Sequence, residues 1–245
     1  MKKKYYLLLI IAFISSSCLT LSSCGGDEDE NEDVNPVELP KAPSVVGVWE
    51  NGRYFVSLSE DKFLTAYIGD NFIDDGTYVV ASDSKSFSCT NTYYNHTTVY
   101  DVVDITDTQM SLNITYMDAF GKTHNKKMIF TKSAKTPVSK DNGIVGKSCR
   151  FITPSFGFVT YSFVTYNSAT KSSEKKGMTN YPLSLHYIYY NENIYFQEFT
   201  SSSSQVPTIG GWTTSVNAGT VIACKLYFDT NGGISDLENS SDQVL

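Results

Sequence analysis

From residue 45 onward, apolar side chains recur at every second position in short runs. The clearest run, residues 110–116, reads Met-Ser-Leu-Asn-Ile-Thr-Tyr, so one face is apolar and the other is polar. An alternation with a period of two is typical of half-buried antiparallel strands. Up to Lys132 the pattern predicts about eight strands: Val45–Glu50, Tyr54–Leu58, Phe63–Ile68, Thr77–Ala81, Ser86–Thr92, Thr97–Ile105, Met110–Asp118 and Asn125–Lys132.

Short turn-forming segments separate these runs and predict how the strands are joined. Ser59 to Lys62 is one such segment, and connections of this length join neighbouring antiparallel strands as hairpins. Successive hairpins form a meander, and a meander of about eight strands leaves no edge unpaired when it closes. The expected fold class is therefore all-β, with a small up-and-down barrel over residues 44–132.

Acidic residues interrupt the pattern before the fourth run. Asp70 and Asn71, and then Asp74 and Asp75, are expected to lie in the connection that precedes Thr77. Asp and Asn are frequent turn formers because their side chains bond the nearby backbone. A calcium site is the alternative, since hard cations take several carboxylate oxygens, but the spacing differs from that of the twelve-residue calcium loop. No metal site is predicted.

Strand-like runs return after a polar linker at residues 133–143. They are Gly157–Tyr166, Leu183–Tyr190, Asn193–Thr200 and Thr220–Phe228. Ile144-Val145-Gly146 repeats the Val45-Val46-Gly47 of the first unit. This repeat suggests that residues 144–237 form a second β-rich unit that is a diverged copy of the barrel, and another kind of β fold is the alternative. Residues 238–245 are expected to be a polar tail.

The first 43 residues follow a different pattern. A basic start, a short apolar core and small residues make up a secretory signal, and the core is too short to span a bilayer stably. Leu21-Ser22-Ser23-Cys24 resembles the bacterial lipoprotein signal, which implies removal of residues 1–23 and attachment of acyl chains such as palmitate to Cys24. Several acyl chains would hold the mature protein on a membrane. An ordinary secretory signal with an incidental cysteine is the alternative.

Residues 24–43 are expected to form an extended spacer. They hold an acidic run from Asp27 to Asp33 and three prolines, with few apolar residues to bury. An acidic run directly after a lipidated cysteine also resembles the surface-export signal of lipoproteins from the Bacteroides group. The expected location is the cell envelope, as an outer-membrane lipoprotein, and the resemblance implies exposure at the cell surface.

The charge of the chain argues against a nucleic-acid partner. Without residues 1–23 the chain has 16 basic and 26 acidic residues, which gives a net charge of −10. Phosphate backbones are bound by concentrated Lys and Arg. The longest basic runs after the signal are pairs such as Lys126-Lys127.

Two short motifs give residues 44–132 a resemblance to lipocalin-like lipoproteins. Gly47-Val48-Trp49 matches their Gly-x-Trp on the first strand, and Gly76-Thr77-Tyr78 fits the strand order. The resemblance implies that the indole plugs one end of the barrel and that a small apolar or amphipathic ligand binds inside. The residues expected to contact this ligand are Trp49, Tyr67, Leu112 and Ile114. If such side chains only fill the barrel, no ligand fits.

A surface that binds glycan or protein is the competing hypothesis. Tyr190 and Tyr195 oppose the apolar face of their strands, and Trp212 follows two glycines in a loop-like stretch. Exposed rings with polar neighbours can stack on sugar faces, whereas rings on an inward face form core. A shared exposed patch would favour this hypothesis, and burial would count against it.

No catalytic motif can be picked out, so the protein is expected not to be an enzyme and to need no cofactor. The three histidines, His96, His124 and His186, stand at no metal-ligand spacing. His96 and His124 lie in turn-like segments, where two exposed loop histidines are preferred over a shared zinc site. An active site assembled from residues far apart in sequence is the third hypothesis.

Three cysteines follow Cys24, and each lies on an apolar strand face: Cys89, Cys149 and Cys224. The preferred interpretation is buried thiols, because a free cysteine behaves as a small core hydrophobe. The alternative is a disulfide between Cys149 and Cys224, whose strands would be neighbours if the second unit closes.

Overall fold

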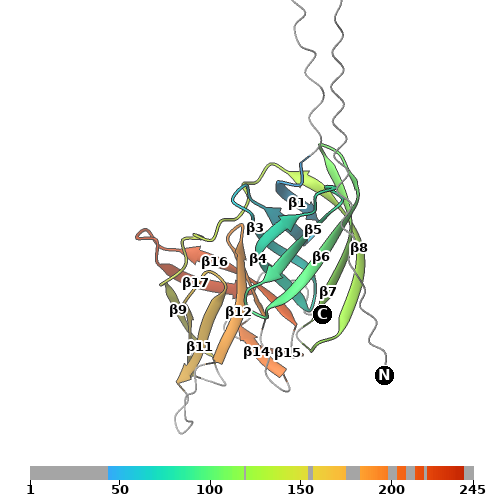
Figure 1. The fold of residues 1–245 in the computed structure, drawn as a ribbon. Coiled ribbons are helices and arrows are strands. Elements are labelled where there is room, and N and C mark those ends of the chain that lie inside the picture. The colour runs from blue at the N-terminus through green and yellow to red at the C-terminus, as the bar shows by residue number, and fades with distance from the viewer. Residues whose placement is uncertain are drawn as a thin grey trace, which may run out of the picture. The chain divides into compact units, whose positions relative to one another are not determined.

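The computed structural model describes residues 44–118, 120–153, 157–174, 183–197, 203–207, 213–217 and 220–239. Strands and their connections make up this part of the chain, with no helix in it. The predictions for the signal, Cys24, the spacer and Trp212 fall outside the described residues. Figure 1 shows a closed barrel and a second curved sheet. The all-β prediction is confirmed.

Eight antiparallel strands form the barrel, and each pairs with its neighbours in sequence. They are β1 (Gly47–Asn51), β2 (Tyr54–Leu58), β3 (Phe63–Gly69), β4 (Phe72–Val80), β5 (Ser86–Asn91), β6 (His96–Ile105), β7 (Gln109–Met117) and β8 (Thr123–Ser133). Pairing of β1 with β8, with Val48 opposite Ser133, closes the ring. The predicted up-and-down barrel is confirmed, and most strand boundaries fall within two residues of the prediction.

Strand β4 is the exception, because it begins at Phe72, well before the predicted start. The turn that precedes it consists of residues 70–71, whereas Asp74 and Asp75 lie inside the strand and are buried. The prediction of a turn at Asp74 and Asp75 is therefore wrong. Side chains of distant strands hold both carboxylates, and a local sequence pattern contains no sign of such partners.

Apolar side chains fill the interior of the barrel. In β7 the buried residues Met110, Leu112 and Ile114 alternate with residues that face outward. Large rings contribute from other strands, and Phe87 stacks on Tyr100 with ring centroids 4.7 Å apart. The alternation along each strand thus places one densely packed core inside the barrel.

A seven-stranded antiparallel sheet forms the second unit, in the order β17-β16-β13-β12-β11-β10-β9. Its strands are β9 (Ser148–Thr153), β10 (Gly157–Phe163), β11 (Ser168–Glu174), β12 (Leu183–Tyr190), β13 (Asn193–Gln197), β16 (Val221–Phe228) and β17 (Ile234–Asn239). A separate hairpin joins β14 (Ser203–Pro207) to β15 (Thr213–Asn217). Strand β17 contacts β9, so the sheet is nearly closed. The unit is β-rich as predicted, but its last strand runs past residue 237.

The barrel and the second sheet pack together as one compact body and meet along an interface that we call the seam. Phe55 of β2 stacks on Tyr190 of β12 there, with ring centroids 3.9 Å apart. The buried apolar residues of the seam are Val48, Phe55, Tyr67 and Ile73 on the outer face of the barrel, and Ile188, Tyr190, Tyr195 and Val221 on the second sheet. The opposite face of the second sheet holds its own core.

Candidate functional site

The residues expected to bind a ligand inside the barrel belong to packed regions. Trp49, Leu112 and Ile114 are buried in the interior cluster, and the Trp49 indole N–H donates to the Val45 carbonyl at 2.8 Å. Tyr67 points the other way, into the seam. An interior ligand would have to displace several of these side chains, because close-packed cores leave few voids larger than a water.

Tyr190 and Tyr195 do not form an exposed patch. Both oppose the inner core of the second sheet, as expected, but the barrel covers them, and they are only 5% and 8% exposed. The Tyr190 hydroxyl donates to Glu50 at 2.6 Å across the seam. This burial counts against the hypothesis of an exposed aromatic patch. The strand pattern does not tell which face of a sheet the rest of the protein covers.

A buried acid–histidine pair crosses the seam. His186 Nε2 lies 2.6 Å from Asp75 Oδ1, and the two side chains are 0% and 1% exposed. Asn167 Nδ2 and Thr92 Oγ1 donate to Asp75 Oδ2 at 2.9 and 3.3 Å. The Tyr93 ring stacks on the imidazole with ring centroids 4.7 Å apart. Side chains from both the barrel and the second sheet therefore hold the Asp75 carboxylate.

This pair combines two groups that enzymes use together for general-base catalysis, but burial keeps both from a substrate. His186 Nδ1 has no hydrogen-bond partner among the described residues. We assign the pair a structural role in joining the two units. The sequence pattern does not reveal the pair, because 111 positions separate the two residues. The one available signal is a histidine within an apolar strand.

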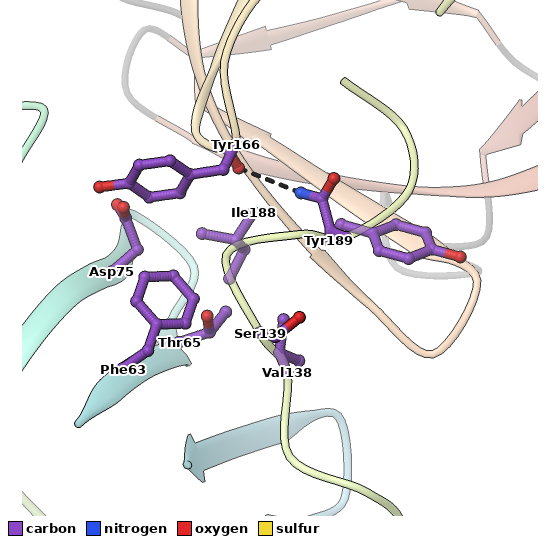
Figure 2. Close-up of a pocket in the computed structure, with 9 residues that line it drawn as sticks. Phe63, Thr65, Asp75, Val138, Ser139, Tyr166, Ile188 and Tyr189 are labelled. Atoms are coloured by element: carbon purple, nitrogen blue, oxygen red, sulfur yellow. Dashed lines mark hydrogen bonds between the residues drawn. The ribbon is translucent and has the colours of Figure 1, made fainter. Parts of the chain in front are cut away.

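Figure 2 shows a pocket beside Asp75, between barrel strands, the linker and the second sheet. Its lining residues are Phe63, Thr65, Asp75, Val138, Ser139, Asn142, Tyr166, Ile188 and Tyr189. The cavity has a volume of about 10 Å³, which is room for a single water molecule. Asn142 donates to the Tyr166 carbonyl at 3.2 Å and ties the linker to the second sheet. The pocket is too small for an organic ligand.

A second buried carboxylate lies on the inward face of β4. Asp74 accepts hydrogen bonds from the Tyr100 hydroxyl at 2.7 Å and from Asn91 Nδ2 at 3.1 Å. Burial raises the pKa of Asp74 to about 6, although both hydrogen bonds oppose the shift. Because this carboxyl group is fully buried, it titrates within the core and is out of reach of a ligand.

One end of the barrel, which we call the mouth, carries the turn between β1 and β2 and the turn between β3 and β4. They share an end because alternate connections of an up-and-down barrel do so. Arg53 Nη2 donates to Asp70 Oδ1 at 2.6 Å and to the Tyr54 hydroxyl at 2.9 Å. The Arg53 and Asp70 side chains are 34% and 65% exposed, so this ion pair adds little stability.

Lys126 projects into the mouth from β8. It lies opposite the inward-facing Ile114 in the strand register, whereas the next residue, Lys127, is exposed on the outer face. The Lys126 ammonium donates to the Ile68 carbonyl at 2.5 Å and lies 4.3 Å from the centre of the Tyr54 ring, within the range of a cation–π contact. Burial lowers the pKa of Lys126, because the charged form loses hydration.

Polar groups converge on Gly69 at the end of β3. A Cβ atom at this position would lie 3.2 Å from Tyr116 Oη, 3.6 Å from Asn71 Oδ1 and 3.8 Å from Lys126 Nζ. The missing side chain therefore lets three polar groups approach one point. The Tyr116 ring stacks on Phe72 with centroids 4.2 Å apart, which fixes its hydroxyl. The mouth cluster, as we define it, consists of Arg53, Tyr54, Gly69, Asp70, Asn71, Tyr116 and Lys126.

Sequence analysis missed the mouth cluster, although a signal for it exists. His124 and Lys126 share the inward face of β8 with Met128 and Phe130. When inward-facing positions of a strand change from apolar to polar residues, that part of the strand lies at the end of the barrel, beyond the apolar core. The contacts with Asn71 and Gly69 could not be seen, because they depend on how the barrel closes.

His96 and His124 do not belong to a shared metal site in the described residues. His124 Nε2 lies 2.7 Å from Asp118 Oδ2, and His96 is the first residue of β6. Within the described ranges, no group of three or more His, Cys, Asp or Glu side chains is arranged to hold a metal. Nor do those ranges contain a helix that is long and apolar enough to cross a membrane.

All three predicted core cysteines are buried. Cys89 belongs to the barrel interior, and Cys149 and Cys224 belong to the inner core of the second sheet. Strand β17 pairs with β16 and contacts β9. It therefore lies between the strands of Cys149 and Cys224, which are not the direct neighbours that closure of the unit was expected to make them. A disulfide between these two cysteines stays a prediction.

No protein-family model and no curated protein matches the sequence. The side chains themselves are therefore the guide to function.

Proposed function

We propose that this protein is a lipid-anchored lipoprotein of the cell envelope that binds a glycan through the mouth cluster, without catalysing a reaction. The observation that carries the proposal is the meeting of Arg53, Tyr54 and Lys126 at a partly exposed end of the barrel. Arginine and tyrosine are enriched where proteins contact partners. Their gathering at one site favours recognition.

The packed interior favours this outer site over a ligand held inside the barrel. An eight-stranded barrel is just wide enough for side chains to fill it or for one small ligand. Trp49, Tyr100 and Phe130 occupy the interior here and are completely buried. A small apolar ligand would need these rings to move, whereas a partner at the mouth requires no such change.

The non-enzymatic part of the proposal rests on accessibility. General acid–base catalysis needs a titratable group within hydrogen-bond reach of the substrate. Asp74, Asp75 and His186 are shielded from solvent. At the mouth, Arg53 and Tyr54 both donate to one oxygen of Asp70, so this carboxylate is already engaged within the protein.

Anchoring is proposed from the resemblance of Leu21-Ser22-Ser23-Cys24 to lipoprotein signals. An acidic, proline-containing spacer would leave the folded part free to meet a partner in the aqueous phase. Cells grown with radiolabelled palmitate should label the wild-type protein but not Cys24→Ser, and the variant should leave the membrane fraction. A labelled Cys24→Ser protein would contradict the assignment.

Binding is tested with the full-length protein in detergent micelles on immobilised dextran, xylan, polygalacturonate and mucin. We expect at least one of these probes to retain the protein and Tyr54→Ala to bind it about tenfold more weakly. Val79→Ala is the control, because Val79 is exposed on the outer face of β4 and lies outside the mouth cluster. Retention by none of the probes, or equal retention of Tyr54→Ala and the wild type, would contradict the proposal.

A further inference from the structure

We infer that the mouth cluster recognises a carboxylate group carried by an acidic polysaccharide, with the Lys126 ammonium as its main charge partner. This inference rests on the proposed function and names the chemical class of the ligand.

Lys126 carries a positive charge that Asp70 offsets only in part, because Arg53 acts on the ammonium in the opposite direction. Of the three N–H donors of an ammonium group, one reaches the Ile68 carbonyl. Within the described residues, the ion pairs involve other charged groups and not Lys126. Burial lowers the pKa of Lys126 and so disfavours its charged form. An anion that approaches the remaining donors would offset this penalty.

Two further groups face the same point. Neither the Tyr116 hydroxyl nor the Asn71 carboxamide has a hydrogen-bond partner among the described residues, and they lie 3.2 and 3.6 Å from the Cβ position of Gly69. Burial raises the pKa of Tyr116, so its hydroxyl keeps the proton and can donate. A carboxylate accepts hydrogen bonds on two oxygens. Lys126 and Tyr116 can supply the donors, whereas the Asn71 atom that faces this point is its Oδ1, which is an acceptor.

The local charge at the mouth favours an anion even though the whole chain has a net charge of −7. Arg53 and Lys126 are positive and Asp70 is negative, so one positive charge is in excess. Arg53 bonds Asp70 at 2.6 Å, which reduces the repulsion between Asp70 and an incoming carboxylate. Asp118, the other acid near Tyr116, is paired with His124.

The remainder of the ligand has to stay in water. The stacked rings of Phe72 and Tyr116 lie at the mouth, and the interior cluster fills the barrel beyond them. An acyl chain attached to the carboxylate would find no path inward. The carboxylate therefore belongs to a hydrophilic body, such as the sugar ring of a uronic-acid polymer, and not to a fatty acid.

The test compares polygalacturonate with its fully methyl-esterified form, which keeps the sugar backbone and removes the negative charges. Dissociation constants are measured for the full-length protein in detergent micelles at one salt concentration. We expect the unesterified polymer to bind at least about tenfold more tightly, and Lys126→Met to lose about tenfold in affinity for it. Lys127→Met is the matched control, because it removes the same charge from the adjacent outward-facing position, and we expect less than about a twofold change.

Tyr116→Phe keeps the ring stack and removes only the hydroxyl, so affinity for polygalacturonate should fall about fivefold. Near-UV circular dichroism checks that each variant is folded. Equal losses for Lys126→Met and Lys127→Met would reveal unspecific attraction to a polyanion and overturn the inference. Equal binding of the two polymer forms would overturn it while leaving the proposed function standing.

Two further binding measurements test the inference that the ligand is an acidic polysaccharide. Binding of dodecanoate in place of polygalacturonate would overturn the choice of a hydrophilic ligand. Absence of binding to polygalacturonate would overturn the inference outright, whereas the proposed function is decided separately by dextran, xylan and mucin.

Discussion

The seam and the mouth use similar side chains in opposite settings. At the seam, Asp75 meets His186 with almost no exposure. At the mouth, Asp70 meets Arg53 in partial contact with solvent, and Lys126 keeps hydrogen-bonding capacity to spare. A shielded pair that loses one partner destabilises the fold strongly, whereas an exposed pair contributes little. Because of this difference in burial, we expect the pair at the seam to stabilise the fold and the residues at the mouth to bind a ligand.

The largest effect is expected from removing His186. His186→Ala would leave the Asp75 carboxylate buried without its closest partner, so the free energy of unfolding should fall by about 3–5 kcal/mol. Urea denaturation followed by circular dichroism measures this change. His124→Ala is the control, because His124 pairs with Asp118 but its side chain is 26% exposed, and the loss there should stay below about 1 kcal/mol. Similar losses in both variants would erase the contrast between a fully shielded pair and one whose histidine is partly exposed.

Asp74→Asn tests a titration inside the barrel. Burial raises the pKa of Asp74 to about 6 in the folded state, against about 4 in the unfolded chain. The folded state thus binds this proton more tightly, and the stabilisation is complete below about pH 4 and lost as the pH rises through about 6. Two pKa units correspond to about 3 kcal/mol.

Asparagine lacks this titration, so the free energy of unfolding of Asp74→Asn should improve relative to the wild type by up to about 3 kcal/mol between pH 4 and pH 7. Urea denaturation of both proteins across this range measures the difference, and groups common to both cancel in it. A difference that does not change with pH would contradict a buried titrating carboxyl group.

Periodicity predicted the barrel because its strands have one apolar face and short hairpins fix their neighbours. It failed at Asp74 and Asp75, where a charged residue occupies a buried strand position and its partners come from other strands. The inward position of Lys126 could have been predicted, since this residue continues the inward face of β8. The burial of Tyr190 could not have been predicted, because it depends on contact between the barrel and the second sheet, which are far apart in sequence.

A smaller effect is expected from one hydrogen bond of the seam. Tyr190→Phe keeps the stack on Phe55 and removes the bond to Glu50, so the free energy of unfolding should fall by about 1 kcal/mol. The control is Tyr195→Phe, because the Tyr195 hydroxyl has no hydrogen-bond partner among the described residues; its change should stay within about 0.5 kcal/mol. Thermal and urea unfolding measure both variants, and an equal loss in the two would show that the bond to Glu50 contributes nothing.

The smallest effect on stability is expected at the mouth itself. Because burial lowers the pKa of Lys126, its charge is disfavoured in the folded state, and Lys126→Met removes the charge while keeping an unbranched side chain beside the Tyr54 ring. The free energy of unfolding in urea at pH 7 should stay constant or rise by up to about 1 kcal/mol, even as affinity for polygalacturonate falls. Residues at binding sites often lower the stability of the fold slightly while they contribute to binding, and we expect Lys126 to behave in this way. A loss of more than about 2 kcal/mol in Lys126→Met would instead make Lys126 a structural residue, and the distinction between mouth and seam would disappear.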